Sequence, residues 1–234
     1  MTPLSVALYA RLGNAMHGYA YARKLSEHTG RELRVAPWIG ESIFTLDGVT
    51  HARPDGSEEV LRGYFQSQKD LIYTRADCRR WFTLRPEVAR ILDADPEMQP
   101  KGITAHFRRG DYAEAGYPLV SRLSVIAAVA KYFPGPTPEI EDVSDEHPVK
   151  HPAFRGDLEM LTDFYRLMRA PILFRANSTF SWWAATLGTG RVFAPVITGL
   201  KGGEEHYTVP YIEGNWPKCA DGLDFVTDLH LKEA

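Results

Sequence analysis

The residues best suited to chemistry lie in the segment His106-Phe107-Arg108-Arg109-Gly110-Asp111-Tyr112. A guanidinium group can hold phosphate oxygens through two parallel hydrogen bonds, a geometry that lysine cannot copy. Arg108 could therefore grip a diphosphate while His106 touches the rest of a nucleotide. The same residues allow another interpretation, in which both arginines pair with Asp111 and other carboxylates in a structural network.

A second polar segment, Asn177 to Ser181, stands between an apolar run and a short helical pattern. Hydroxyl and amide groups placed before a helix amino terminus can hold an anion. They can equally cap the helix, with Ser178 or Ser181 as the N-cap. Asn177-Ser178-Thr179 also matches a glycosylation sequon, which we discount because the sequence shows no secretion signal.

Both segments follow apolar runs that predict buried strands, Ile103–Phe107 and Ile172–Phe174. Side chains alternate between the two faces of a strand. His106 and Arg108 are therefore expected on one face. Arg109 is expected on the other face, where it would pair with protein carboxylates. Further strands are predicted at 5–9, 32–38, 140–143 and 191–195.

Apolar residues at helical spacing predict helices at about 15–29, 85–92, 121–132, 158–168 and 182–188. Gly30 is the expected C-cap of the first helix and Asp157 the expected N-cap of the fourth. The first strand, glycine turn and helix form half of a Rossmann-like unit, which leaves Gly13 and Asn14 open to an anionic ligand. The alternative is a tight turn with Asn14 as N-cap.

Composition narrows the class of protein. The 234 residues are 44% hydrophobic and 24% charged, as in soluble globular enzymes, and the net charge of −3 gives no basic surface for nucleic acid. Cys78 and Cys219 offer neither a disulfide scaffold nor metal-ligand spacing, so a reduced cytoplasmic location is expected. No apolar run reaches membrane-spanning length, although peripheral membrane contact stays open.

The segment from Asp93 to Gly102 contains Pro96 and Pro100 and is the expected boundary between two domains. We therefore expect one domain at residues 1–95 and another at 96–234. The tail after Pro195 is rich in turn-forming residues and predicts little.

Four segments, in this order, resemble the bacterial α-1,2-fucosyltransferases of glycosyltransferase family 11. Arg11–Ala20 resembles that family's RLGNQMFQYA, Gly63–Lys69 resembles GYFQSEK, His106–Tyr112 resembles HxRRGDY, and Asn177–Ala185 resembles NSTFSWWAA. The sequence departs from the first motif at Ala15, His17 and Gly18. It is also some tens of residues shorter than is usual for the family, which suggests trimmed acceptor-binding loops.

The resemblance implies an α/β fold of the glycosyltransferase-B type, with two Rossmann-like domains facing a cleft. The first domain would lie on the acceptor side and the second would bind the GDP-sugar. It implies an inverting, metal-independent enzyme that needs no cofactor and moves fucose from GDP-fucose to a glycan hydroxyl, in α-1,2 linkage to galactose. The alternatives are a related enzyme with another nucleotide-sugar donor and a non-catalytic nucleotide-sugar-binding protein.

The resemblance also implies roles for individual residues. Arg108 would contact the β-phosphate with Arg109 in support, and Gly13 and Asn14 would close the cleft from the other domain. The expected catalytic residues are Arg108, Asp111 and Asn14. The expected nucleotide-binding residues are Gly13, His106, Arg108, Arg109, Asp145, Asn177, Ser178, Thr179, Phe180 and Ser181.

An inverting transfer also needs a group that takes the proton of the acceptor hydroxyl. Asp111 and Glu114 both follow the arginines closely enough to be candidates. Asp111 could instead orient Arg109 or cap the following turn.

Overall fold

The structure is a computed structural model that describes residues 1–67, 70–115, 117, 119–136, 138–198, 211–212 and 225–227. The chain divides into two compact units, the first holding Met1–Arg90 and the second beginning at Ile91. The expected boundary after residue 95 thus falls just inside the second unit. Cys219 and two residues of the second motif, Gln68 and Lys69, lie outside the described residues.

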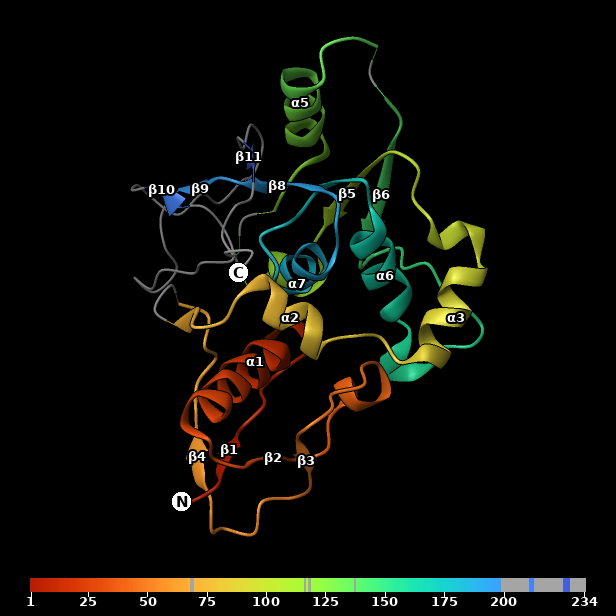
Figure 1. The fold of residues 1–234 in the computed structure, drawn as a ribbon. Helices are drawn as coiled ribbons and strands as arrows, with labels where there is room; N and C mark the ends of the chain where they lie inside the picture. The colour runs from red at the N-terminus through yellow and green to blue at the C-terminus, as the bar shows by residue number, and fades with distance from the viewer. Residues whose placement is uncertain are drawn as a thin grey trace. The chain divides into compact units, whose positions relative to one another are not determined.

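The first unit contains a parallel sheet of four strands in the order β3-β2-β1-β4 (Figure 1). Its strands are β1 (Leu4–Val6), β2 (Leu33–Val35), β3 (Thr50–His51) and β4 (Glu59–Leu61). Strands β1 and β2 were predicted, but as longer strands at 5–9 and 32–38. The sequence did not predict β3 or β4, because they are very short and lie in or beside a polar, turn-rich segment.

Helix α1 (Leu12–Thr29) covers one face of this sheet. A Cβ atom at Gly18 would lie 3.2 Å from Leu8 Cδ2 and 3.6 Å from Val6 Cγ2, so the helix packs closely on β1. Gly30 ends the helix in the left-handed conformation, at φ 67°, which confirms the predicted C-cap. The helix begins earlier than predicted, after Arg11, so Asn14 lies inside the first turn and the alternative with Asn14 as N-cap is wrong.

Two more helices and a 3-10 turn follow along the chain: η1 (Ile39–Ser42), α2 (Arg75–Trp81) and α3 (Pro86–Ala94). Helix α3 was predicted and spans the division between the units. Helix α2 was not predicted, because only Cys78 and Trp81 of its residues are buried. The Thr74 hydroxyl begins it by accepting a hydrogen bond from the Asp77 backbone N–H.

The second unit contains a five-stranded sheet in the order β11-β8-β7-β5-β6. The strands are β5 (Ile103–Phe107), β6 (Ile140–Ser144), β7 (Ile172–Phe174), β8 (Arg191–Pro195) and β11 (Phe225–Thr227). The first four are mutually parallel and match the predicted strands, whereas β11 runs antiparallel to β8. A separate parallel pair joins β9 (Ile197–Thr198) to β10 (Tyr211–Ile212). The chain is therefore an α/β protein with parallel sheets.

The helices of the second unit are α4 (Gly110–Glu114), α5 (Arg122–Tyr132), α6 (Leu161–Arg169) and α7 (Thr179–Leu187), with 3-10 turns η3 (Pro96–Met98) and η4 (Gly156–Leu158). The prediction of Asp157 as an N-cap is wrong: Gly156, at φ 58°, opens the separate turn η4, and α6 starts after Met160. Helix α7 starts earlier than predicted, directly after Ser178.

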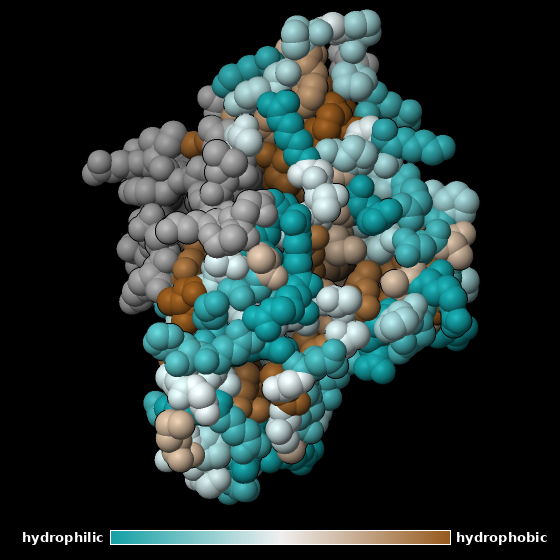
Figure 2. All heavy atoms as spheres, viewed as in Figure 1, coloured by the Kyte–Doolittle hydropathy of each residue, from teal (hydrophilic) through white to brown (hydrophobic). Residues whose placement is uncertain are grey.

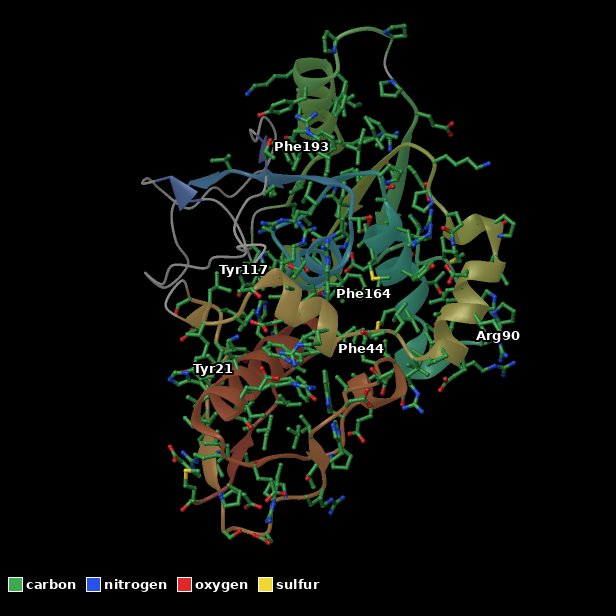
Figure 3. All side chains as sticks on the ribbon, viewed as in Figure 1. Tyr21, Phe44, Arg90, Tyr117, Phe164 and Phe193 are labelled. Atoms are coloured by element: carbon green, nitrogen blue, oxygen red, sulfur yellow. The ribbon has the colours of Figure 1, made fainter. Side chains whose placement is uncertain are left out.

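The two faces of the second sheet differ in what packs on them. Phe107 points toward the core that includes α5, in which Phe174 and Phe193 stack at 4.6 Å between ring centroids (Phe193 is labelled in Figure 3). On the other face, the ring of Phe180 in α7 meets Phe164 of α6 at 5.2 Å and His106 of β5 at 5.9 Å. The predicted alternation of His106 and Phe107 is therefore confirmed as far as the strand extends.

On the face drawn in Figure 2, hydrophilic side chains cover most of the described surface, and hydrophobic ones show in smaller areas between them. Within the described ranges, no helix combines the length and the apolar character needed to cross a membrane.

Candidate functional site

The candidate site lies at the carboxyl ends of β5, β6 and β7. Strand β5 stands between β6 and β7, so the chain leaves β5 toward β6 on one side and later returns to place β7 on the other. The connections after β5 and β7 therefore diverge, which is the arrangement at which open α/β sheets bind ligands. The two polar segments singled out in the sequence both begin at this edge.

Arg108 is the most firmly held charged residue of the site. Its Nη2 lies 2.6 Å from Asp111 Oδ1 and its Nη1 lies 2.9 Å from Asp145 Oδ2, and its guanidinium lies 5.3 Å from the ring centroid of Tyr112. Only 14% of the side chain is exposed. The structural network that the sequence allowed is thus present, and it fixes the direction of the guanidinium group.

Arg109 does not behave as predicted. Its guanidinium lies over the ring of Phe107, 5.2 Å from the centroid, and forms no ion pair with any residue that the structure describes. The expectation that Arg109 pairs with carboxylates is wrong, as is the idea that Asp111 orients it; Asp111 pairs with Arg108. The contact with Phe107 agrees with the predicted face of Arg109, although strand pairing ends at Phe107 and Arg109 adopts φ −117° and ψ −112°.

Asp145 ties the connections after β5 and β6 together. It directly follows β6, and its Oδ1 accepts a hydrogen bond of 2.7 Å from the Arg109 backbone N–H, in addition to the Arg108 contact. Gly110 adopts φ +30°, and a Cβ atom there would lie 2.8 Å from Asp145 Oδ2. The close approach of this carboxylate therefore requires glycine at position 110.

The start of α7 supplies the third part of the site. Ser178 Oγ accepts a hydrogen bond of 3.3 Å from the Phe180 backbone N–H, so the capping alternative for Ser178 is seen. The buried Ser181 hydroxyl donates at 3.3 Å to the carbonyl oxygens of Ala176 and Ser178, which turns it toward the protein. The first turn of any helix presents backbone N–H groups that suit an anion. Asn177 and Thr179 flank this cap.

Tyr112 links the segment that follows β5 to the segment that follows β7. Its hydroxyl donates a hydrogen bond of 3.2 Å to the Asn177 backbone oxygen, while its ring lies under Arg108. Burial raises the pKa of Tyr112 to about 12, so the phenol keeps the proton that it donates. The segments around residues 108, 145 and 177 are therefore joined directly by hydrogen bonds and ion pairs.

His106 is buried beneath these arginines, with 3% of its surface exposed. Its Nδ1 has no hydrogen-bond partner among the described residues. Burial, and then the positive charges of Arg108, Arg109 and Arg175, lower the pKa of His106 from 6.5 to about 3. The imidazole is therefore neutral at neutral pH and can accept or donate a hydrogen bond without adding charge.

The lowered pKa of His106 predicts a pH-dependent stability. Unfolded histidine binds a proton near pH 6.5, but folded His106 does so only near pH 3, so its contribution is present above pH 6.5 and is lost as the pH falls toward 3. We expect the free energy of unfolding, measured with urea between pH 7.5 and 4.5, to fall less steeply in His106→Gln. The exposed His28 is the control: His28→Gln should keep the wild-type slope, and equal slopes in all three proteins would contradict the assignment.

Arg175 is a residue that the sequence analysis missed. It follows β7 directly, is fully buried, and donates from Nη1 to the Ala176 backbone oxygen at 3.2 Å. Its charge acts on His106, which places a third arginine at this edge of the sheet. The criterion that singled out Arg108, an arginine at the carboxyl end of a buried strand, would also have found Arg175.

The expected site residues of the first unit lie together at the start of α1. Gly13 is buried in the first helical turn, and Asn14 Oδ1 accepts a hydrogen bond of 3.0 Å from Gln66 Nε2. This bond joins the first two motif segments, which are far apart in the sequence. His17, one of the departures from the first motif, is buried with its Nδ1 3.2 Å from the Tyr73 hydroxyl.

In the described part of the chain, no three His, Cys, Asp or Glu side chains come together in a way that could hold a metal ion. The sequence does contain one Asp-x-Asp, at Asp93-Ala94-Asp95. Asp93 accepts a hydrogen bond from the Tyr165 hydroxyl, and Asp95 accepts one from the Glu97 backbone N–H at 2.9 Å. Both carboxylates are thus occupied in local structure.

Comparison with known proteins finds a relationship of fold. No protein-family model matches the sequence, and no curated protein matches it. Among solved structures, NodZ α-1,6-fucosyltransferase soaked with GDP-fucose matches with a TM-score of 0.52, and the same enzyme co-crystallised with GDP matches with 0.50. In both, the identity is 17% over 82% of this chain and 94% of that chain. The chain shares its fold with NodZ.

A structure of fucosyltransferase NodZ from Bradyrhizobium matches with a TM-score of 0.48, at 17% identity over 82% of this chain and 96% of that chain. The two structures with TM-scores of 0.50 and 0.52 are named as an α-1,6-fucosyltransferase, so they do not support the α-1,2 linkage that the motifs imply.

Proposed function

We propose that this chain is an inverting, metal-independent fucosyltransferase that moves fucose from GDP-fucose to a glycan hydroxyl. The observation that carries the proposal is the convergence of Arg108, Arg109 and the start of α7 at the carboxyl ends of β5 and β7. These are the segments that resemble fucosyltransferase motifs. The fold shared with NodZ, a fucosyltransferase studied with GDP and GDP-fucose, supports the same activity.

The proposed chemistry follows from the charges. Breaking the bond between fucose and phosphate leaves a diphosphate whose negative charge grows in the transition state, and oriented donors stabilise that charge. Arg108 is already held in one direction by two carboxylates and an aromatic ring, so little reorganisation is needed. Arg109, which forms no ion pair within the described residues, has its charge available for phosphate. The backbone N–H groups of Ser178 and Thr179 add further donors, while the Phe180 N–H donates to the Ser178 cap.

Other residues take supporting roles in this proposal. Asp145 positions Arg108 and the Arg109 backbone, and in the proposal both Asp145 and His106 contact the nucleotide. Gly13 and Asn14 act from the first unit. The proton of the acceptor hydroxyl goes to a carboxylate, for which Asp111 and Glu114 are the candidates. Asp111 is engaged by Arg108, whereas Glu114 is exposed and its carboxylate makes no hydrogen bond or ion pair with described residues.

The finer parts of the proposal rest on the motif resemblance. These are the glycosyltransferase-B arrangement, with residues 1–95 on the acceptor side and 96–234 binding the GDP-sugar, and the α-1,2 linkage to galactose. A cytoplasmic location also stays a prediction.

The activity can be tested by incubating the protein with GDP-fucose and simple galactosides and measuring GDP release and fucosylated product. We expect both, and the linkage follows from the product's NMR spectrum. Release from another nucleotide sugar, with none from GDP-fucose, would identify a related transferase with a different donor. GDP binding by calorimetry without turnover over a broad acceptor panel would favour a non-catalytic nucleotide-sugar-binding protein.

Metal independence is a separate prediction. The motifs bring arginines and backbone donors to the diphosphate, and these can neutralise its charge without a divalent cation. We expect an excess of EDTA to leave the rate of GDP release unchanged. Activity that EDTA abolishes and manganese restores would show that this part of the proposal is wrong.

A further inference from the structure

A pocket of about 460 Å³ opens in the first unit, and none of its lining residues is among the candidate donor-site residues. It is lined by Ser5, Val6, Ala7, Leu8, Ala36, Pro37, Trp38, Pro54, Val60 and Arg62. These residues cluster at the carboxyl ends of β1, β2 and β4. Because β1 stands between β2 and β4, this edge is also a point where the connections diverge and where open α/β sheets bind ligands.

Among the residues that line the pocket, Ser5 lies on the sheet face opposite α1. Leu8 and Val6 point toward Gly18 of α1, so Ser5 points the other way. Ser5 pairs in register with Val60 of β4, which shares its face and also lines the pocket. Ser5 is 1% exposed, and its hydroxyl has no hydrogen-bond partner among the residues that the structure describes. A buried hydroxyl that lines a pocket and lacks a partner points to a ligand that supplies one.

The pocket carries one positive charge, that of Arg62, which no carboxylate in the described residues neutralises. Arg62 directly follows β4, lines the pocket and forms no ion pair within the described residues. Arg34, on the same face as Ser5, shows the contrast, because it pairs with three carboxylates, those of Glu32, Asp55 and Glu58. No acidic side chain lines the pocket, so its net charge is positive.

We propose that this pocket binds a carboxylate-bearing sugar unit of the acceptor glycan. Arg62 takes the carboxylate through two parallel hydrogen bonds, and the Ser5 hydroxyl bonds a hydroxyl of the sugar ring. The walls of alanine, proline and valine face the C–H groups of the ring. The inference rests on the proposed function, because it makes this sugar part of the molecule that receives fucose.

The test compares methyl β-D-glucuronide with methyl β-D-glucoside, which differ only in the carboxylate, by calorimetric or NMR titration of the whole chain. We expect the glucuronide to bind roughly tenfold more tightly, the effect of one charge-assisted hydrogen-bonded contact. Arg62→Ala and Arg62→Gln should remove that difference. Ser5→Ala should weaken the binding of both sugars but preserve the difference in affinity between them. Arg90→Ala is the matched control, since Arg90 is an exposed arginine of the same unit at the outer edge of α3 (Figure 3).

Equal binding of the two sugars, binding of neither, or a preference that survives Arg62→Ala would overturn the inference. The affinity of Arg62→Ala for GDP is measured in parallel and should equal that of the wild type. A loss of GDP affinity would assign Arg62 to the donor and would overturn the inference too. Glucuronide binding by a protein that does not bind GDP would refute the proposed transferase while leaving a sugar site at Arg62, so the two failures are distinguishable.

Discussion

Arg108→Ala is expected to lower turnover of GDP-fucose by roughly 10²–10³-fold, the loss typical of removing one donor to a developing oxyanion. The guanidinium stands between Asp111 and Asp145 and acts most strongly as charge grows on the leaving diphosphate. Turnover should therefore fall more than GDP affinity. Arg108→Lys should not restore the rate, because an ammonium group lacks the planar fork. The measurements are kcat, GDP affinity by calorimetry and melting temperature.

Arg122→Ala is the matched control for this variant. Arg122 is an exposed arginine of the same unit that also pairs with an aspartate, Asp142, so the change in charge is the same. We expect its turnover to equal that of the wild type. Wild-type turnover in Arg108→Ala would contradict the assignment, and it would leave the Arg108–Asp145 pair as a structural contact alone.

Gly110→Ala is expected to reduce turnover by about 10²-fold, the loss that a misplacement of about 1 Å in a catalytic group can cause. Residue 110 has φ +30°, and the added Cβ would lie 2.8 Å from Asp145 Oδ2. The carboxylate must move, which disturbs its bonds to Arg108 and to the Arg109 backbone N–H. The backbone strain should lower the free energy of unfolding by about 1–3 kcal/mol.

Gly156→Ala is the control that distinguishes the effect of backbone strain from the effect of the clash with Asp145. Gly156 belongs to the same unit and has φ +58°, but nothing lies within 4 Å of the place where its Cβ would stand. We expect a similar loss of stability from Gly156→Ala with turnover unchanged. If Gly110→Ala kept full turnover despite this clash, Asp145 would not be positioning the arginines.

The sequence predicted the parts of the fold that depend on local patterns. The short runs of β5 and β7 are mostly apolar and lie inside the sheet, so a run of apolar residues there marks both a strand and its burial. Helix α2 escaped prediction because its seven residues bury only two side chains. Asp157 was wrongly predicted to cap α6. An aspartate is a common N-cap, but here it belongs to the separate 3-10 turn that begins at Gly156.

For the candidate site, too, the sequence predicted local features but not the contacts between distant segments. Two of the four motif segments, His106–Tyr112 and Asn177–Ala185, meet at one edge of the second sheet. The prediction that Arg109 pairs with carboxylates failed, although its guanidinium does lie beside Phe107, the residue expected to share its face; beyond Phe107, Arg109 and Gly110 take backbone angles that strand geometry does not give. The bond between Asp145 and the Arg109 backbone N–H spans 36 positions, so it depends on the pairing of β5 with β6 and not on any local pattern.

A crystal structure of the protein soaked with GDP tests the central claim most directly. The account predicts that the diphosphate lies at the carboxyl ends of β5 and β7, with its oxygens within hydrogen-bond distance of the Arg108 guanidinium and of backbone N–H groups between Ser178 and Phe180. It also predicts that the nucleoside lies near His106 and Asp145. A diphosphate bound elsewhere, or no bound GDP at a concentration that saturates a fucosyltransferase, would contradict it.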